Sequence, residues 1–131
     1  MLISNLMYSV GAFLADWNET HVLNPRWPPH ARFHNGQTMS LGVLLSSSSA
    51  YFMFRGRDSP AAITDSLWTS AVIGTFYNIS ALSAIWYPGT LWSDPEFGSG
   101  RPQLYLFSGL TVLNWFGYWL ESSRIKKSKR T

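Results

Sequence analysis

Acidic and basic residues are missing from four long stretches of the chain, and this pattern constrains the fold more than any other feature. The charge-free stretches are residues 1–15, 33–54, 66–93 and 102–120. A helix that crosses a bilayer core of about 30 Å needs roughly 20 mostly apolar residues, and charges inside it cost several kcal/mol each. We therefore expect an all-α fold, an integral membrane bundle of four transmembrane helices.

The chain has 131 residues, which is enough for a single domain. We expect this transmembrane domain to contain spans at about residues 2–16, 35–54, 60–86 and 103–122, followed by a basic tail at 124–131. Charged residues make up 13% of the chain, about half of the roughly 25% that is usual in soluble domains. The mean hydropathy of −0.03 argues in the other direction, because Ser, Thr and Asn are frequent inside the stretches.

Small and polar residues recur at intervals of four along the third expected span. Ser66, Ser70, Gly74 and Asn78 share one helical face, and small side chains allow two helices to approach closely. We expect this face to be the central helix-packing surface. The preceding Ser59-Pro60 pair indicates where this helix begins.

Basic residues gather on one side of the expected topology, in the 55–62 connection and in the C-terminal tail. The positive-inside rule therefore predicts that both termini are cytoplasmic. Lys127 and Lys129 occupy the positions of a K-x-K-x-x retrieval signal, which predicts location in the endoplasmic reticulum membrane. The alternative is a basic flank that attracts anionic lipid.

Chemistry-bearing side chains are concentrated in residues 16–34, which include all three histidines. Carboxylates and imidazoles that lie close together can act as general acid and base. The candidate catalytic residues are Asp16, Glu19, His21 and His30. A second set is expected to contact substrate or to form a structural network, and it consists of Asn18, Thr20, Asn24, Arg26, Trp27, Arg32 and His34.

A purely structural role is the alternative for the same segment. Asp16 can cap backbone groups. Arg26 or Arg32 can neutralise Asp16 or Glu19 within an ion-pair network. In that case the segment stabilises the connection between two helices and carries no chemistry.

Several function classes lack their sequence signals. The chain has no Cys, which excludes disulfides and thiolate chemistry. The separation of His21 from His30 matches no strong metal-site spacing, so we expect no metal and no other cofactor. There is no Gly-rich phosphate loop and no nucleophile elbow. The basic tail is explained by the expected membrane, so nucleic acid is not an expected partner.

Residues 16–34 resemble the signature of a family of small four-span fungal and bacterial proteins, with the pattern D-x-N-x-T-H-x-x-N-P-x-W-P-P-H-A-R-F-H. A more remote similarity leads to the EXPERA group, which includes the emopamil-binding sterol isomerases. It rests on Asp16 at the end of the first span, on the Val-Leu-Asn-Pro segment at 22–25 and on residues 54–63 at the entry to the third span. The chain departs from that group in having no evident His-x-x-x-Glu pair inside a span, which disfavours direct sterol isomerisation.

The resemblance implies an accessory role in fungal secondary metabolism. We expect a subunit of a biosynthetic complex that assists cyclisation of a hydrophobic polyketide–peptide intermediate. Its expected partners are the lipid membrane, other small membrane proteins, a membrane-bound haem-thiolate monooxygenase and a hydrophobic small molecule. The alternatives are a stand-alone EXPERA-like isomerase or cyclase that uses acid–base catalysis, and a structural or lipid-binding membrane protein.

Overall fold

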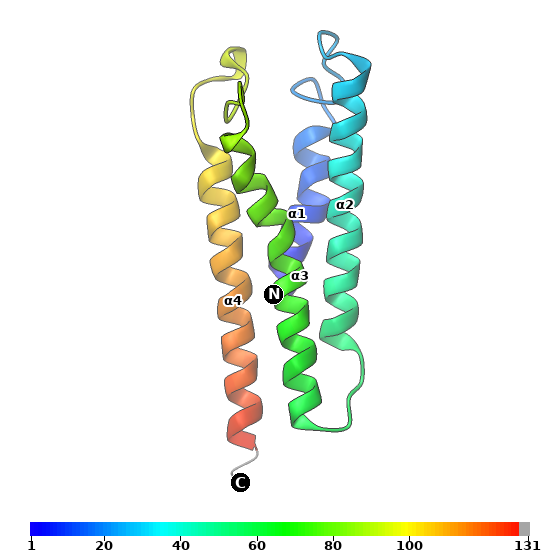
Figure 1. Cartoon of the computed structure of the whole chain (residues 1–131), viewed down its shortest axis with the longest axis vertical. Helices are drawn as coiled ribbons and strands as arrows, with labels where there is room; N and C mark the ends of the chain where they lie inside the picture. The colour runs from blue at the N-terminus through cyan, green and yellow to red at the C-terminus, as the bar shows by residue number, and fades with distance from the viewer. Residues whose placement is uncertain (129–131) are drawn as a thin grey trace.

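Four antiparallel helices build the part of the chain that the computed structural model describes, residues 1–128 (Figure 1). They are α1 (Leu2–Asp16), α2 (Pro29–Phe54), α3 (Pro60–Ser83) and α4 (Pro102–Ser128). Two short 3-10 helices, η1 (Ala84–Trp86) and η2 (Pro95–Phe97), lie between α3 and α4. Because the helices alternate in direction, the 17–28 and 87–101 connections meet at one end of the molecule.

Proline marks the first position of three of these helices. Pro29, Pro60 and Pro102 begin α2, α3 and α4, where a fixed φ favours the helix and the missing N–H is not needed. The Ser59 hydroxyl caps α3 by accepting a hydrogen bond of 3.2 Å from the Ala62 N–H. The second helix begins at Pro29, earlier than the expected start near residue 35. Of the two adjacent prolines, Pro28 is extended and Pro29 is already helical.

The last helix is longer than the expected span. α4 continues to Ser128, so the first half of the expected basic tail is helical. Lys127 lies in the last turn of α4, where a cation interacts favourably with the helix dipole. Lys129 lies outside the described residues, and the retrieval signal stays a prediction.

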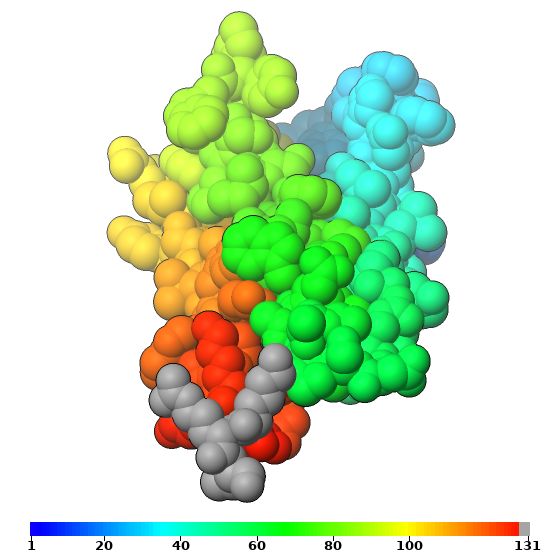
Figure 2. Space-filling model, turned by 60° about the horizontal axis from the view of Figure 1, so that its bottom comes forward, coloured from blue at the N-terminus to red at the C-terminus, as the bar shows by residue number. Residues whose placement is uncertain are grey.

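The helices pack in the order of the chain, and α1 is much the shortest. With a rise of 1.5 Å per residue, α1 is about 22 Å long and the other three are about 36–40 Å long. It therefore packs beside only half of the bundle, the half next to the 17–28 connection. At the opposite end, the last turns of α4 lie beside the first turns of α3 (Figure 2), where Tyr118 and Ile125 face Pro60 and Trp68.

The expected transmembrane bundle is wrong, although the all-α class and the four-helix architecture are present. None of the helices within residues 1–128 combines the length and the apolar character that crossing a bilayer requires. The physical reason is that a charge-free stretch is not necessarily an apolar one. α2, for example, contains four consecutive serines at 46–49 in addition to histidine, asparagine and glutamine.

Buried polar side chains connect all four helices at the centre of the molecule. The Asn5 amide of α1 donates to the Ser49 hydroxyl of α2 at 2.7 Å, and that hydroxyl donates to the Ser70 carbonyl of α3 at 2.9 Å. The Asn114 amide of α4 donates to the Ala71 carbonyl at 2.7 Å. Each such bond stabilises the fold by only about 1 kcal/mol, but losing one partner of a buried pair costs more. The network thus selects one helix arrangement.

The small-residue face of the third helix lies inside the bundle. Ser66, Ser70, Gly74 and Asn78 are all buried. An added Cβ at Gly74 would lie 2.7 Å from the Asn5 amide oxygen and 3.3 Å from the Asn114 amide. Gly74 therefore lets α1 and α4 approach α3 at the same level.

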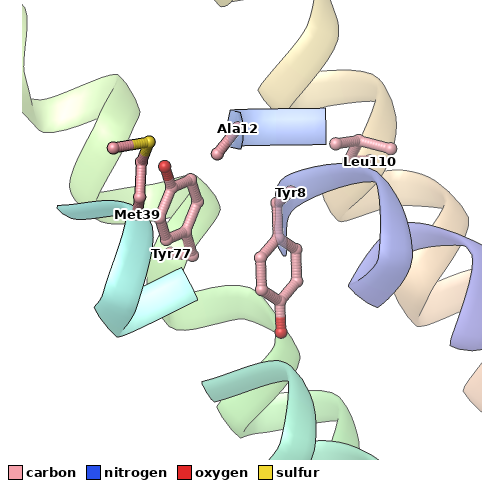
Figure 3. Close-up of a cluster of buried hydrophobic side chains, with 5 residues drawn as sticks. All are labelled: Tyr8, Ala12, Met39, Tyr77 and Leu110. Carbon is pink, nitrogen blue, oxygen red and sulfur yellow. The ribbon is translucent and has the colours of Figure 1, made fainter. Parts of the chain in front are cut away.

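A small apolar cluster lies beside the polar network, nearer to the 17–28 connection. It consists of Tyr8, Ala12, Met39, Tyr77 and Leu110 (Figure 3). The rings of Tyr8 and Tyr77 stack with their centroids 5.1 Å apart. Three of its residues, Tyr8, Ala12 and Tyr77, also line the cavity described below.

Large apolar side chains also lie on the outer faces of the helices. Leu14, Leu44, Phe76 and Tyr105, one from each helix, are all exposed. The interior is therefore unusually polar for its size, and much apolar surface faces outward. Surfaces of this kind commonly mark places where a partner binds.

Candidate functional site

Asp16 is the last residue of α1, and the backbone turns immediately after it. The Trp17 N–H donates to the Phe13 carbonyl at 3.0 Å, and the chain then leaves the helix. The Val22 N–H returns to donate to the Asp16 carbonyl at 3.1 Å. This closed turn holds the Asp16 side chain at the end of the helix and brings residue 21 back beside it.

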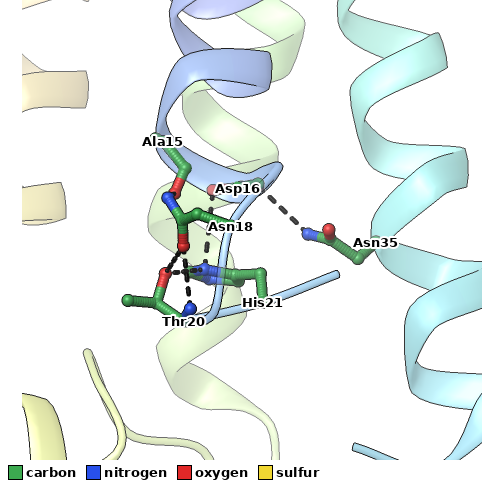
Figure 4. Close-up of polar contacts among 6 residues, drawn as sticks. All are labelled: Ala15, Asp16, Asn18, Thr20, His21 and Asn35. Atoms are coloured by element: carbon green, nitrogen blue, oxygen red, sulfur yellow. Dashed lines mark hydrogen bonds and ion pairs between the residues drawn. The ribbon is translucent and has the colours of Figure 1, made fainter. Parts of the chain in front are cut away.

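Asn18 organises the turn through both ends of its amide group (Figure 4). Its Nδ2 donates to the Ala15 carbonyl at 2.8 Å, so Oδ1 is left as the acceptor. That Oδ1 accepts hydrogen bonds from the Thr20 N–H at 2.8 Å and from the Thr20 hydroxyl at 2.6 Å. This is the Asx-turn geometry that asparagine favours.

The Thr20 hydroxyl assigns the tautomer of His21. A hydroxyl has one hydrogen to donate, and Thr20 donates it to Asn18. The 2.7 Å contact between Thr20 Oγ1 and His21 Nδ1 must therefore be an N–H donation from the imidazole. The hydrogen is on Nδ1, and the Nε2 of His21 carries a free lone pair that can accept a proton.

The Asp16 carboxylate lies between this turn and α2. Its Oδ2 accepts a 3.0 Å hydrogen bond from the Asn35 amide, and its Oδ1 lies 3.8 Å from His21 Nδ1. The Asp16 side chain is 19% exposed and that of His21 is 35% exposed. The ring of Trp27 contacts the imidazole edge-on, with centroids 5.1 Å apart. A carboxylate and an imidazole are thus held side by side with limited access to water.

These two residues line a cavity of about 510 Å³ inside the bundle. Its walls come from all four helices and from the 87–101 connection. Apart from Asp16 and His21, the lining consists mainly of apolar and small side chains: Met7, Tyr8, Gly11, Ala12, Ala15, Tyr77, Ala81, Ala84, Ile85, Leu91, Trp92, Leu106 and Phe107, with Thr38, Thr90 and Gln103 as the other polar members. An apolar pocket of several hundred Å³ with a few polar groups is the usual form of a small-molecule site.

Tyr77 and Gln103 add two more polar groups to the cavity wall. Burial, together with the smaller effect of the negative charge of Asp16, raises the pKa of Tyr77 to about 12. The Tyr77 hydroxyl therefore stays protonated at neutral pH and is available as a donor. The Gln103 Oε1 is buried and accepts no hydrogen bond from the described residues.

One family model matches residues 1–130 of the chain. The chain belongs to the family of unknown function DUF6640. No curated protein and no solved structure matches the chain. The function of this DUF6640 member must therefore be argued from its own geometry.

In this DUF6640 protein, Arg26 and Arg32 do not neutralise Asp16 or Glu19 in the way that the structural alternative expected. Arg26 pairs instead with Glu96 in the connection between α3 and α4. Arg32 donates to the Asn24 carbonyl at 2.6 Å, and Asn24 is buried and accepts from the Arg26 N–H at 3.0 Å. These contacts fasten the 17–28 connection to its surroundings.

The remaining candidates lie away from the cavity. Glu19 is exposed and does not share a helical face with Asp16, because α1 has already ended. His30 and His34 contact each other on the outside of α2, with their Nε2 atoms 3.0 Å apart, and neither lines the cavity. Within residues 1–128, no three histidine or acidic side chains form a group that could hold a metal ion. Of the four candidate catalytic residues, the fold brings together only Asp16 and His21.

Sequence reasoning missed Tyr77, Asn35 and Asn5. Tyr77 lies in an aromatic-rich stretch with no local signal that it faces a cavity. For Asn5 the sequence does contain a signal. An amide within an apolar stretch needs a buried hydrogen-bond partner, which predicts a contact with another helix. Asn35 reaches Asp16 only because α2 begins at Pro29 and turns this residue toward α1.

Proposed function

We propose that this DUF6640 protein binds an apolar small molecule that carries a hydroxyl or a similar donor at one end. The observation that supports this function best is the 510 Å³ cavity with Asp16 and His21 at its polar end. Apolar lining favours a hydrocarbon body by about 25 cal/mol per Å² of buried surface. The polar groups then decide how the ligand is oriented.

The hydrogen-bonding groups that line the cavity determine which polar group the ligand carries. The Asp16 carboxylate, the His21 Nε2 and the Gln103 Oε1 are acceptors, and the Tyr77 hydroxyl is a donor in the same wall. A ligand donor can satisfy one of them, whereas a ligand carboxylate would be repelled by Asp16. An alcohol is therefore preferred over a fatty acid of the same chain length.

A binding experiment with tritiated hexadecanol tests this function. Gly11→Leu should lower the affinity at least about tenfold, because a leucine there extends into the cavity. The matched control is Gly109→Leu on α4, since an added Cβ meets nothing within 4 Å at either glycine but only Gly11 lines the cavity. Equal affinity of the two variants in equilibrium dialysis would contradict the proposed site, as would a preference for hexadecanoate over hexadecanol.

Acid–base catalysis is a second candidate, and the free Nε2 of His21 favours it. An imidazole that can take a proton beside a carboxylate can move a proton from one carbon of an unsaturated ligand while another returns to a different carbon. This is the isomerase alternative, without its sterol specificity. Turnover in D₂O should then place deuterium in an apolar alkenol, as seen by mass spectrometry, and His21→Gln should abolish it. A ligand that binds without gaining deuterium marks a binding protein.

The accessory role beside a haem-thiolate monooxygenase, with assistance to cyclisation, stays a prediction, as do the resemblances that led to it. Two features of the molecule are compatible with such a role but do not point to it specifically. A site that binds a flexible apolar intermediate in one conformation promotes cyclisation by reducing the entropy lost in ring closure. The exposed apolar side chains of all four helices provide surface for protein partners. Co-purification with neighbouring biosynthetic enzymes is the test of this role.

A further inference from the structure

A second cavity adjoins the first one. It has a volume of about 410 Å³ and lies between α2 and α3. Thr38, Leu41, Leu45, Phe76, Tyr77, Ser80, Ala81 and Ala84 line it. Four of these residues, Thr38, Tyr77, Ala81 and Ala84, also line the first cavity. The two spaces therefore share one wall.

Among the four residues that line both cavities, Tyr77 has by far the largest side chain. Thr38, Ala81 and Ala84 have small side chains, so the aromatic ring of Tyr77 supplies most of the bulk. One face of this ring stacks on Tyr8. Gly42 makes room for its edge, because an added Cβ there would lie 3.2 Å from Tyr77 Cε2.

We propose that the two cavities form one binding path for a long apolar chain, with Tyr77 as the residue that sets the chain length. This inference rests on the proposed function. The hydroxyl of the ligand lies at Asp16 and His21, and the tail passes Ala81 beside the Tyr77 ring into the space between α2 and α3. The substrate class is therefore an extended long-chain alcohol rather than a compact polycyclic one.

The geometry supports an extended ligand in two ways. Both cavities are mainly apolar away from Asp16 and His21, so a hydrocarbon tail finds apolar contacts along the whole path. A rigid, wide ligand cannot occupy both spaces, because Tyr77 is buried and held by Tyr8 and Phe107. In the proposed path a narrow chain passes beside the small side chains of Thr38, Ala81 and Ala84, which line both cavities.

Short and long alcohols separate the two cavities experimentally. Ser80 lines only the second cavity, so Ser80→Trp fills that space and leaves the first one open. In equilibrium dialysis with tritiated octanol and hexadecanol, this variant should lose about tenfold in affinity for hexadecanol and keep its affinity for octanol. Ser83→Trp is the matched control, because Ser83 is on the same helix and lines neither cavity.

The complementary variant is Tyr77→Ala, which merges the two cavities and should increase the preference for hexadecanol over octanol. Circular dichroism verifies that each variant is folded. Ser80→Trp overturns the chain-length inference if it leaves hexadecanol binding unchanged or weakens both alcohols equally. If Gly11→Leu still weakens both alcohols in that case, the first cavity binds ligand and only the path is wrong. Failure of the unaltered protein to bind either alcohol overturns the proposed function and this inference together.

Discussion

At the scale of single residues, the site depends on the hydrogen bonds of Asn18 and Thr20, which engage Nδ1 of His21 and leave its Nε2 as an acceptor. Asn18 accepts from Thr20, Thr20 accepts from His21, and the imidazole is left with a free Nε2. Local turn chemistry, not distant packing, thus sets the protonation pattern of the imidazole. Asp16 is positioned by the same turn and by Asn35.

In Thr20→Val, the His21 ring should no longer be restricted to the tautomer with hydrogen on Nδ1. Valine has nearly the same shape but accepts no hydrogen bond, and such a bond contributes about 1 kcal/mol. We expect about a fivefold loss of affinity for hexadecanol and a shift in the ¹⁵N resonances of the His21 ring toward a mixture of tautomers. Thr64→Val, at the far end of α3, removes only a hydrogen bond to the Pro60 carbonyl and is the control. Unchanged ring resonances in Thr20→Val would show that Thr20 does not determine the tautomer of His21.

Tyr77 should make the stability of the fold depend on alkaline pH. Its pKa is about 12 in the folded protein against 10.0 for an unperturbed tyrosine, so the unfolded chain loses this proton first. The stabilisation is complete below pH 10 and is lost as the pH rises toward 12, by an amount on the order of 2 kcal/mol. Urea unfolding across this window should show a steeper decline for the unaltered protein than for Tyr77→Phe. Parallel declines rule out a contribution from Tyr77. Burial of Tyr8 also raises its pKa, so some decline persists in the variant.

At the scale of helices, close approach at one glycine determines how α1 and α4 meet α3. Gly74 is buried where Asn5 and Asn114 converge, and both amides belong to hydrogen bonds between helices. α1 also contacts α4 through the buried Ser4 hydroxyl, which donates to the Leu110 carbonyl at 3.0 Å. The position of the cavity between these helices therefore depends on the level at which Asn5 and Gly74 meet.

Gly74→Ala should destabilise the protein by about 1–3 kcal/mol, since its methyl group overlaps the Asn5 amide oxygen at 2.7 Å. Gly109→Ala on α4 should instead be neutral or stabilising by up to about 1 kcal/mol, because nothing lies within 4 Å and alanine favours a helix. The free energy of unfolding in urea distinguishes the two. An equally stable Gly74→Ala protein indicates that α1 can shift without cost.

At the scale of the whole molecule, two connections that are far apart in the sequence meet above the cavity. Arg26 of the 17–28 connection pairs with Glu96 in the 87–101 connection. Residues 90–92 and His21, from the same two connections, line the cavity beneath this pair. The pair holds the two connections together at the cavity end of the bundle.

The Arg26–Glu96 pair should contribute little to global stability, because the Arg26 side chain is 67% exposed and water screens the attraction. A double-mutant cycle with Arg26→Gln and Glu96→Gln should give a coupling energy below about 1 kcal/mol, and high salt should reduce it further. The exposed pair Glu121–Arg124 on α4 is the reference. A coupling of several kcal/mol contradicts the expected screening.

Some of this architecture follows from sequence alone. Pro60, with Ser59 before it, predicts the start of α3, because proline and a capping hydroxyl act locally. The turn around Asn18 that brings Asp16 and His21 together is likewise local, and the sequence predicts both residues as candidate catalytic residues.

Only the tertiary structure determined the rest. The sequence could not show that Arg26 pairs with Glu96, that Tyr77 separates two cavities or that Glu19 and His30 face away from Asp16, because these relations depend on how helices distant in the chain pack. The membrane interpretation failed for a different reason: a helix without charges is not necessarily apolar, and the serines and asparagines that lower its hydropathy are already visible in the sequence. Some of these polar residues, among them Asn5, Ser49 and Asn114, bond to partners on other helices, and only the folded arrangement reveals those partners.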